Sequence, residues 1–467
     1  MTDLLRLPAL ELAALLRARK VASLDLVDES LERIEAGNPA LQAFADVMPE
    51  RARAEARSAD GRLRRRGGGD PPPFLGVPLA VKDLNLARGS FTRFGSRAFE
   101  RLFTPFDDPV VALLRRAGFV IVGKTTTSEL GALPVTEPDI HPPARNPWDP
   151  DVTPGGSSGG AGIAVAAGMV PVAQGSDAGG SIRIPSSFCN LFGIKPSRGR
   201  VVNPFLFEDE RIIWSCGPMT RTVDDAAAML DVMAGLTSGS PHWAPPPPRP
   251  FAELARERPP RLRVRMAIRA TKVETEPEIG AAVERVAELL SRQGHTIETT
   301  TLEMPEGIVD EFLPLWQATT ATAPIADWSV TQPVTRWLGE QGRHVPPSEV
   351  QRIIDKVAAI VLGQFGDADV WLTPTVAVAP PRIGAWRGLS PRDAFFAAAD
   401  LGVFTAPFNV SGQPAATVPA GRSRRGHPIG VQIAGRPLAD GLVLGLARQI
   451  ERAMPWADDR PELPAQP

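Results

Sequence analysis

The chain has 467 residues, of which 43% are hydrophobic, and its formal net charge at pH 7 is −2. This near neutrality disfavours nucleic acid or an anionic membrane as a partner, and no apolar run approaches the ~20 residues that a membrane-spanning helix requires. The N-terminal segment carries acidic side chains and lacks the small-residue cleavage site of a signal peptide. We therefore expect a cytoplasmic protein that has a sizeable core and acts on a small molecule, as a monomer or a homodimer.

Three features of the composition limit the chemistry. Neither C-x-x-C nor H-E-x-x-H occurs, so we expect no metal site and no cofactor. The two cysteines, Cys189 and Cys216, have no histidine near them in sequence and are expected to fill the core. Tyrosine is absent, and only six of the 51 basic residues are lysine. Because lysine can lose its proton in a protein and arginine cannot, a lysine beside a candidate nucleophile is a candidate base.

Helices are predicted for the beginning of the chain. An apolar stripe on residues 12–19 indicates an amphipathic helix. Ser23 is a typical N-cap for a second helix, in which apolar residues recur at spacings of three and four as far as Ile34. The basic segment 51–66 is predicted to be a helix with a solvated face, and the glycine- and proline-rich loop 67–73 separates it from the core.

Strands and helices alternate after this loop. Segment 74–83 is predicted to be an apolar strand that ends near Lys82, and the segments 109–118 and 119–124 a helix and the next strand. A proline-rich, irregular loop follows over 134–154. Lys82 either extends from its strand end to solvent, as most lysines do, or is a desolvated amine with a lowered pKa.

The stretch 153–185 has the marks of an active site. Its two Gly-Gly-Ser segments carry Ser157 and Ser181 and are separated by small and apolar residues. The glycines let a ligand approach main-chain N–H groups, which could hold a carbonyl oxygen. The spacer predicts a buried helix over 160–168 and a strand over 169–174. Both serine clusters are therefore expected to extend from a rigid, buried unit.

The first half of the chain is predicted to close soon after this stretch. Residues 182–200 indicate a short helix and an edge strand, and Thr222 is expected to cap an apolar helix that ends by Gly235. The proline-rich connection 235–260 then separates the two halves.

The second half is predicted to return to the same sheet. Residues 262–304 form one β-α-β unit, and 308–363 are helical. A strand within 370–380, a closing strand pair within 404–435 and a final helix over 439–453 complete the chain. The whole pattern predicts one large α/β domain with a mixed central sheet covered by helices on both sides.

One alternative motif lies within the glycine-rich stretch. Residues 155–159 satisfy G-x-S-x-G, so an α/β-hydrolase with Ser157 as its nucleophile has to be considered. The context is unfavourable, because the motif follows the turn 146–154 and not a hydrophobic strand. His427, the late histidine that such an enzyme requires, lies in a segment typical of an exposed hairpin loop. A phosphate-binding loop is less favoured still, since Gly-Lys-Ser/Thr does not follow.

Five segments together carry a family resemblance. They are VKD at 81–83, GKTTTSE at 123–129, NPWDPDVTPGGSSGG at 146–160, GSDAGGSIRIPSS at 175–187 and GIKPSRGR at 193–200. On these motifs the chain resembles the amidase signature family, whose members are serine hydrolases that cut amides, anilides, esters and carbamates through a Ser–Ser–Lys triad. Weaker likenesses continue to the C-terminal region.

Because the likeness covers nearly the whole chain, it implies one amidase signature domain over residues 1–467. Within that domain we expect N-terminal helices over 1–66, a signature core with the triad over 74–234, and the proline-rich loop 235–260. Residues 261–467 are expected to complete the sheet and the substrate pocket.

The resemblance implies roles for three residues. It makes Ser181 the nucleophile, Ser157 a bridging serine that follows a cis peptide bond, and Lys82 the general base. The sequence departs from the family at three positions: Ser176 stands where threonine is common, Ala178 where a larger side chain is usual, and Ala161 follows the first glycine run. No triad member is lost.

The surroundings of the nucleophile are also implied by the resemblance. The backbone N–H groups of an oxyanion hole are expected at Ala178, Gly179 and Gly180, together with Ser181 itself. Asp177 and Arg183 are expected either to brace that segment or to form an ordinary structural ion pair, and Ser158 is placed with them behind the reacting groups.

The family likeness places the substrate pocket at two segments, and four residues are its candidates: Leu130, Gly131, Trp316 and Gln317. These segments supply no fixed cation for a carboxylate, so we expect a neutral, hydrophobic amide, anilide, ester or carbamate as substrate. Two alternatives remain. One is a glutamine-hydrolysing subunit of a multi-subunit amidotransferase, and the other is a pseudoenzyme or binding protein.

Overall fold

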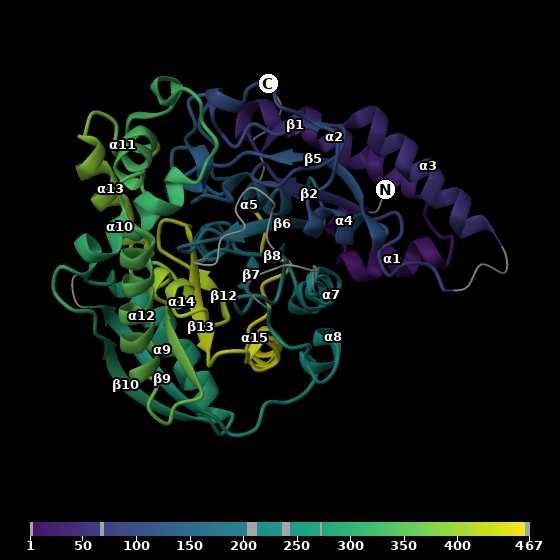
Figure 1. The fold of residues 1–467 in the computed structure, drawn as a ribbon. Helices are drawn as coiled ribbons and strands as arrows, with labels where there is room; N and C mark the ends of the chain where they lie inside the picture. Colours follow the sequence, from purple (N-terminus) through teal and green to yellow (C-terminus); the bar gives the residue numbers. More distant parts are fainter. Residues whose placement is uncertain (1–2, 66–69, 203–212, 236–242, 271–272, 463–467) are drawn as a thin grey trace.

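The computed structural model describes residues 3–65, 70–202, 213–235, 243–270 and 273–462. Its centre is an eleven-stranded sheet with the strand order β1-β5-β2-β6-β8-β7-β12-β13-β11-β9-β10 (Figure 1). The strands of this sheet are β1 Phe44–Val47, β2 Pro78–Lys82, β5 Val120–Thr125, β6 Val172–Asp177, β7 Phe192–Lys195, β8 Ser215–Thr220, β9 Arg263–Ala270, β10 Thr296–Leu302, β11 Val370–Pro374, β12 Ala415–Arg422 and β13 Pro428–Gly435. A separate two-stranded sheet pairs β3 Ser90–Phe91 with β4 Phe103–Thr104.

The sheet is mixed, as the sequence predicts. β5, β2 and β6 run parallel to one another, and so do β11, β9 and β10. Antiparallel pairs through β8, β7, β12 and β13 join these two groups. The edge strand expected within 182–200 is therefore wrong, because β7 lies between β8 and β12 in the middle of the sheet. All four residues of β7 are buried, whereas the true edge strand β10 is largely exposed.

Helices cover both faces of the sheet. Their bounds are α1 Ala9–Arg17, α2 Ser23–Leu41, α3 Pro49–Arg64, α4 Pro109–Arg116, α5 Gly159–Ala166, α6 Arg183–Phe188, α7 Val223–Met233, α8 Phe251–Leu254, α9 Pro277–Arg292, α10 Ile308–Ala321, α11 Pro333–Gly342, α12 Pro347–Gly363, α13 Pro391–Ala399, α14 Ala406–Val410 and α15 Asp440–Ala453. None of the helices in the described part of the chain is long and apolar enough to cross a membrane.

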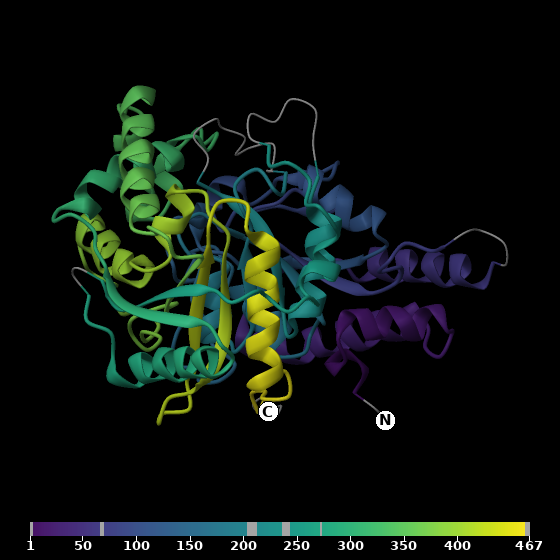
Figure 2. The same cartoon turned by 90° about the horizontal axis from the view of Figure 1, so that it is seen from below.

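The alternation of side chains along β2 shows how the two faces are filled. Leu79 and Val81 pack into a core cluster with α1, α4, α7, α9 and α15, whereas Ala80 between them packs with α2, α3 and α5 on the other face. Successive residues of a strand point to opposite faces, so a continuous apolar strand is buried on both sides. Figure 2 shows α15 and α7 side by side, with α9 running crosswise near the end of α15.

A group of helices from the second half extends beyond the sheet. α10, α11, α12 and α13 lie together at one end of the molecule in Figure 1, and α14 packs against α12. Apolar side chains of α10, α12 and α14 join a core cluster with strand residues such as Trp371 and Ala415, and those of α11 and α13 form a smaller cluster beside it. This group later supplies one wall of the candidate site.

Two helix starts were predicted from capping residues, and one prediction is wrong. Thr222 caps α7, since its hydroxyl accepts the Asp225 N–H at 3.2 Å. Ser23 is instead the first residue of α2. Its hydroxyl does not cap the helix but donates to the Gly76 carbonyl at 2.8 Å, and the carboxylate of Asp60 accepts its N–H at 2.7 Å. A carboxylate on α3 replaces the local cap, which sequence spacing alone does not reveal.

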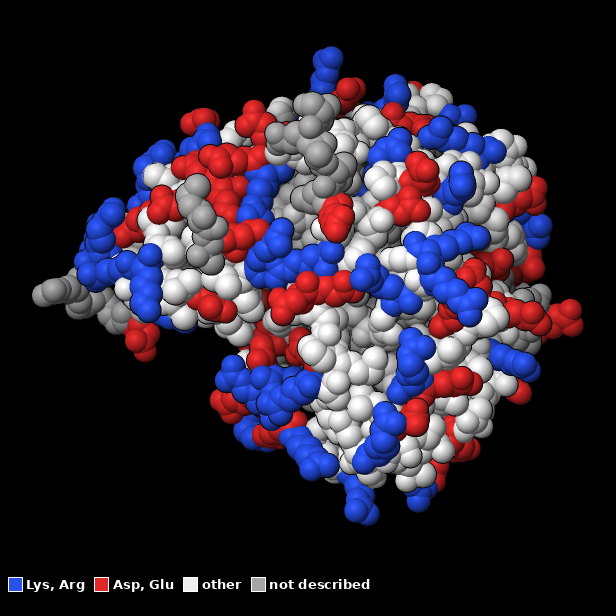
Figure 3. All heavy atoms as spheres, turned by 180° about the vertical axis from the view of Figure 1, so that it is seen from behind, with Lys and Arg blue, Asp and Glu red and all other residues white. Residues whose placement is uncertain are grey.

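Smaller differences concern the loops. The strand predicted over 169–174 begins later, at Val172, and continues to Asp177. Of the proline-rich connection 235–260, residues 236–242 lie outside the described residues, and α8 forms a short helix near its end. On the face shown in Figure 3, positive and negative side chains are interspersed over the surface.

His427 lies in the loop of the β12–β13 hairpin, as expected, but the expected exposure of this residue is wrong. The side chain is buried, and its Nε2 atom lies 2.9 Å from Asp149 Oδ2. Asp149 belongs to the loop that precedes the first glycine-rich segment, so the histidine fastens that loop to the β12–β13 hairpin.

Candidate active site

The ends of two parallel strands and the starts of two helices bring the candidate residues together. β2 ends at Lys82 and its parallel neighbour β6 ends at Asp177. α5 begins directly after Ser158, and α6 begins two residues after Ser181. Ligand sites in α/β folds lie beyond the carboxyl ends of such strands. The two serine segments are also joined directly, since the Ser158 N–H donates to the Ser181 carbonyl at 3.2 Å.

Lys82 is completely buried and contacts two serines. Its Nζ atom lies 2.7 Å from Ser157 Oγ, 3.0 Å from Ser176 Oγ and 3.3 Å from the Ser176 carbonyl oxygen. Burial lowers the pKa of Lys82 to about 7, although the charge of Asp177 acts in the opposite direction. The lysine therefore does not extend to solvent, and its amine can be neutral near neutral pH.

Ser157 and Ser181 are both buried but differ in what they face. The peptide bond between Gly156 and Ser157 is cis. Ser157 is 2% exposed and lies close to Gly131, where an added Cβ would approach Ser157 Oγ to 3.3 Å. Ser181 is 7% exposed and lines a cavity. An incoming substrate therefore meets Ser181, whereas Ser157 lies behind it with Lys82.

An ion pair organises the segment that carries Ser181. Arg183 donates from Nε and Nη2 to the Asp177 carboxylate, each at 2.9 Å, and both side chains are fully buried. Burial alone would raise the pKa of Asp177, but the charge and hydrogen bonds of Arg183 hold it well below its usual range. Asn409 of α14 donates to the same carboxylate at 2.9 Å. The pairing of Asp177 with Arg183 is thus present.

The same carboxylate decides which backbone N–H groups stay free. Gly180 donates to Asp177 Oδ1 at 2.7 Å and Ile182 to Oδ2 at 3.1 Å. Gly180 takes a φ of +131°, and an added Cβ would lie 2.4 Å from Thr405 Oγ1. Of the N–H groups expected in the oxyanion hole, that of Gly180 is therefore engaged elsewhere.

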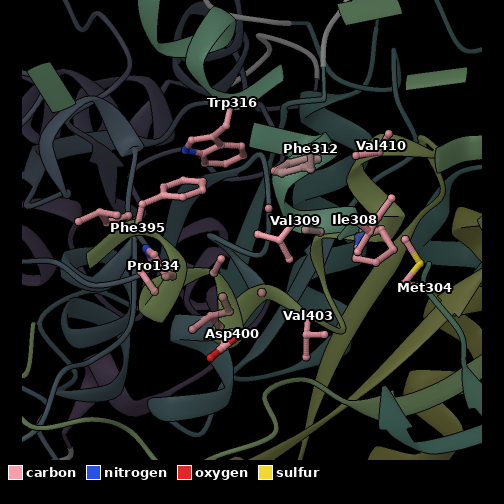
Figure 4. A pocket seen from close by; sticks show the side chains of 18 of the residues that line it. Pro134, Met304, Ile308, Val309, Phe312, Trp316, Phe395, Asp400, Val403 and Val410 are labelled. Atoms are coloured by element: carbon pink, nitrogen blue, oxygen red, sulfur yellow. The ribbon is translucent and has the colours of Figure 1, made fainter. Parts of the chain in front are cut away.

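A cavity of about 150 Å³ opens in front of Ser181. Its wall combines the segment 131–134 with residues of α10, the region from Phe395 to Val410, and Gly179 (Figure 4). Trp316 lies against Gly179, since an added Cβ there would approach its ring to 3.2 Å. The Trp316 indole N–H donates to the Ala132 carbonyl at 3.0 Å, which fixes the ring.

Two of the four predicted pocket residues line this cavity and two do not. Gly131 and Trp316 are part of its wall. Leu130 and Gln317 are both buried but do not line it, and the Gln317 backbone packs against Gly342 of α11. Trp316 and Gln317 are neighbours on α10 whose side chains point about 100° apart, and only Trp316 lines the cavity.

Sequence reasoning missed two residues of the site. Ser176 was noted only as a departure from the family, yet both its hydroxyl and its carbonyl contact Lys82. Asp400, which directly follows α13, lines the cavity together with the apolar residues. No local motif marks Asp400, because it lies more than 200 residues from Ser181 in sequence.

Other titratable groups lie outside this arrangement. Cys189 and Cys216 are buried, as expected for core residues, and burial raises the pKa of each thiol. Over the described ranges of the chain, no group of three His, Cys, Asp or Glu side chains is placed to hold a metal ion.

Comparison with known proteins identifies what this chain is similar to. Residues 25–444 match the family model described as Amidase. A protein of Synechocystis sp. whose name describes it as a candidate amidase is 40% identical over 100% of this chain and 92% of its own length. The structure of 6-aminohexanoate cyclic dimer hydrolase complexed with substrate is 31% identical, with a TM-score of 0.89 over 98% of this chain and 99% of that one. A bacterial aryl acylamidase of the amidase signature family is 25% identical, with a TM-score of 0.86 over 98% and 99% of the two chains.

Proposed function

Because this chain belongs to the amidase family, we propose that it is an amide hydrolase in which Ser181 is the nucleophile, Ser157 relays protons and Lys82 is the base. The observation that carries the proposal is the 2.7 Å contact between Lys82 Nζ and Ser157 Oγ, made by a completely buried lysine. Such a contact supports proton transfer without a histidine.

The proposed reaction proceeds through an acyl-enzyme. Neutral Lys82 takes the proton of Ser157, Ser157 takes that of Ser181, and Ser181 Oγ bonds to the substrate carbonyl carbon. The tetrahedral intermediate then expels the amine, which receives the proton held by Lys82 through Ser157. A water molecule repeats these steps on the acyl-enzyme, which releases the acid and restores the three side chains.

The oxyanion of the intermediate requires hydrogen-bond donors. We propose the backbone N–H groups of Gly179 and Ser181, with Ala178 beside them, because Asp177 already accepts the N–H of Gly180. Asp177 and Arg183 have a supporting role in this proposal, because their ion pair stabilises the turn in which these donors lie. Preorganised donors of this kind contribute strongly because they need not reorient as charge develops.

The same groups would also cleave anilides, esters and carbamates, whose carbonyl carbons accept the same nucleophile. The apolar wall of the cavity favours hydrophobic substrates, since burying apolar surface gains roughly 25 cal/mol per Å². The chemistry requires no cofactor.

An amidotransferase subunit that hydrolyses glutamine is the alternative. It is disfavoured because none of the described residues that line the cavity is lysine or arginine, so the α-carboxylate of glutamine would lose its hydration without a partner.

The purified chain, tested without any partner protein, separates these functions. We expect turnover of a 4-nitroanilide and of an aryl carbamate, with kcat/KM well above that for free glutamine. Release of 4-nitroaniline or phenol and release of ammonia measure the three rates. If glutamine were the best of the three substrates, the amidotransferase function would be favoured instead. If none of the three were turned over, the result would contradict an autonomous hydrolase.

A second prediction concerns Ser176. A neutral amine has two N–H donors and one lone pair. If both N–H groups of Lys82 are directed to the hydroxyl and carbonyl of Ser176, the lone pair is left for the proton of Ser157. Ser176 therefore orients the base.

Ser176→Ala should lower kcat about tenfold, the scale of one hydrogen bond to a charged group. Because the hydroxyl also stabilises the ammonium form, its loss should move the inflection of the activity profile to lower pH. Ser176→Thr retains the hydroxyl and should retain both rate and profile. An alanine variant with an unmoved inflection would show that Ser176 only fills space.

A further inference from the structure

The wall of the substrate cavity carries a single ionisable side chain among the described residues. Of the lining side chains, only those of Ser181, Trp316 and Asp400 have nitrogen or oxygen atoms. Ser181 is the proposed nucleophile, and the Trp316 indole N–H already donates to the Ala132 carbonyl. Asp400 therefore presents the one charge that a bound substrate would meet on this wall.

The rest of the protein does not account for an acid at this position. Partial burial of the Asp400 carboxyl raises its pKa, and no positive side chain among the described residues offsets that effect. Asp400 directly follows α13 and is also the first residue of the 3-10 helix Asp400–Gly402, so the dipoles of the two helices act on its charge in opposite directions. Neither an ion pair nor helix capping explains it.

The position of Asp400 is suited to a substrate group. Figure 4 shows Asp400 across the cavity from Trp316, with Val309 between them in the view. The residue is exposed, so the cavity meets solvent where the carboxylate lies. A charged group placed there would keep part of its hydration while the apolar wall buries the chain that connects it to the reacting carbonyl.

We propose that Asp400 selects amides that carry an ammonium group remote from the scissile carbonyl, joined to it by an apolar spacer. The inference rests on the proposed function and names its substrate class. The spacer gains from burial against α10 and the segment 131–134, and the ammonium group pairs with the carboxylate at the cavity mouth. A substrate that ends in a carboxylate would be repelled.

Matched 4-nitroanilides test the inference. One series has ω-aminoacyl groups of increasing length, a second replaces the ammonium group by methyl, and a third replaces it by carboxylate. A parallel set carries the amine in the leaving group, as N-acyl diamines. At the best length we expect kcat/KM of the ammonium substrate to exceed that of the methyl substrate about tenfold, as for a charged hydrogen bond at a partly exposed site, and to fall as salt is added.

Three variants assign the preference to this residue. Asp400→Asn should reduce the ratio of ammonium to methyl substrate to about one, and Asp400→Lys should reverse the order in favour of the carboxylate substrate. Glu306→Gln is the matched control, because Glu306 is exposed next to the lining residue Pro305 but does not itself line the cavity. It removes the same charge and should leave the ratio unchanged.

The outcomes separate this inference from the proposed function. A ratio near one at every spacer length in both substrate sets, or an ammonium preference that survives in Asp400→Asn, would overturn the role of Asp400 alone. A folded wild-type protein that hydrolyses none of the methyl substrates would contradict the proposed hydrolase instead. Melting temperatures of the variants establish that each compared protein is folded.

Discussion

Ser181→Ala is expected to lower kcat by about four orders of magnitude or more, because the variant lacks the atom that forms the acyl-enzyme. Ser181 is the serine that faces the cavity, and its loss should not disturb the Asp177–Arg183 ion pair behind it. Stopped assays at high enzyme concentration measure the residual rate, and thermal unfolding shows whether the fold is intact.

Ser186→Ala is the matched control for this variant. Ser186 lies in α6 on the same segment, it is completely buried, and its hydroxyl has no hydrogen-bond partner among the described residues. The same chemical change there should leave kcat within about twofold, because it removes no hydrogen bond made among the described residues. Wild-type activity in Ser181→Ala would eliminate the proposed nucleophile.

Covalent labelling identifies the nucleophile independently. A fluorophosphonate or sulfonyl fluoride should modify Ser181 in the wild type and nothing in Ser181→Ala. Trypsin leaves Ser157 and Ser181 on one peptide, since no lysine or arginine lies between Arg145 and Arg183. Cleavage at Asp177 separates the two serines before mass analysis. A label on Ser157 would favour the α/β-hydrolase alternative.

The parts of the site that sequence predicts well are those encoded by contiguous residues. The glycine-rich segments and the strand that ends at Lys82 are each specified locally, and the structure brings Lys82 to Ser157 as the family likeness implies. The Asp177–Arg183 pair joins residues six positions apart, so residue types and spacing were enough to predict it.

Features that depend on distant segments were not predictable in this way. β7 is central because β8 and β12 pair with its two edges, and β12 lies more than 200 residues further on. His427 is buried because a loop carrying Asp149 covers it. Asp400 has no sequence neighbour that marks it as part of a cavity. In each case the outcome depends on contacts between distant segments, and periodicity and capping rules consider only residues that are close in sequence.

Lys82→Arg is expected to be as inactive as Lys82→Met, although arginine keeps the positive charge. The proposed base must accept a proton from Ser157, and a guanidinium group stays protonated at any pH that the protein tolerates. Both variants should lose about three or more orders of magnitude in kcat, within the range seen when a general base and its nucleophile act as one unit. An active Lys82→Arg enzyme would show that the charge, and not the proton transfer, matters.

The pH dependence of the wild-type activity should reflect the titration of the Lys82 amine. Burial lowers the pKa of Lys82 to about 7, so the neutral amine becomes more abundant as pH rises. We expect kcat/KM to increase with pH through about 7 and to level off above it, with about 1% of the plateau value two pH units below the inflection. A profile that is flat from pH 5 to 9 would contradict a lysine base.

A second buried lysine makes the assignment of this inflection a separate question. Burial, assisted by the charge of Arg183, also lowers the pKa of Lys195 to about 7. Its Nζ atom donates to the Pro196 carbonyl at 2.9 Å and takes no part in the proposed relay. Lys195→Met should therefore keep the inflection, provided that thermal unfolding shows a folded protein. If the inflection disappears in that variant but stays at the wild-type pH in Ser176→Ala, whose lost hydroxyl contacts Lys82, the titrating group is Lys195. An inflection that persists in Lys195→Met and moves to lower pH in Ser176→Ala assigns it to Lys82, which contacts Ser157.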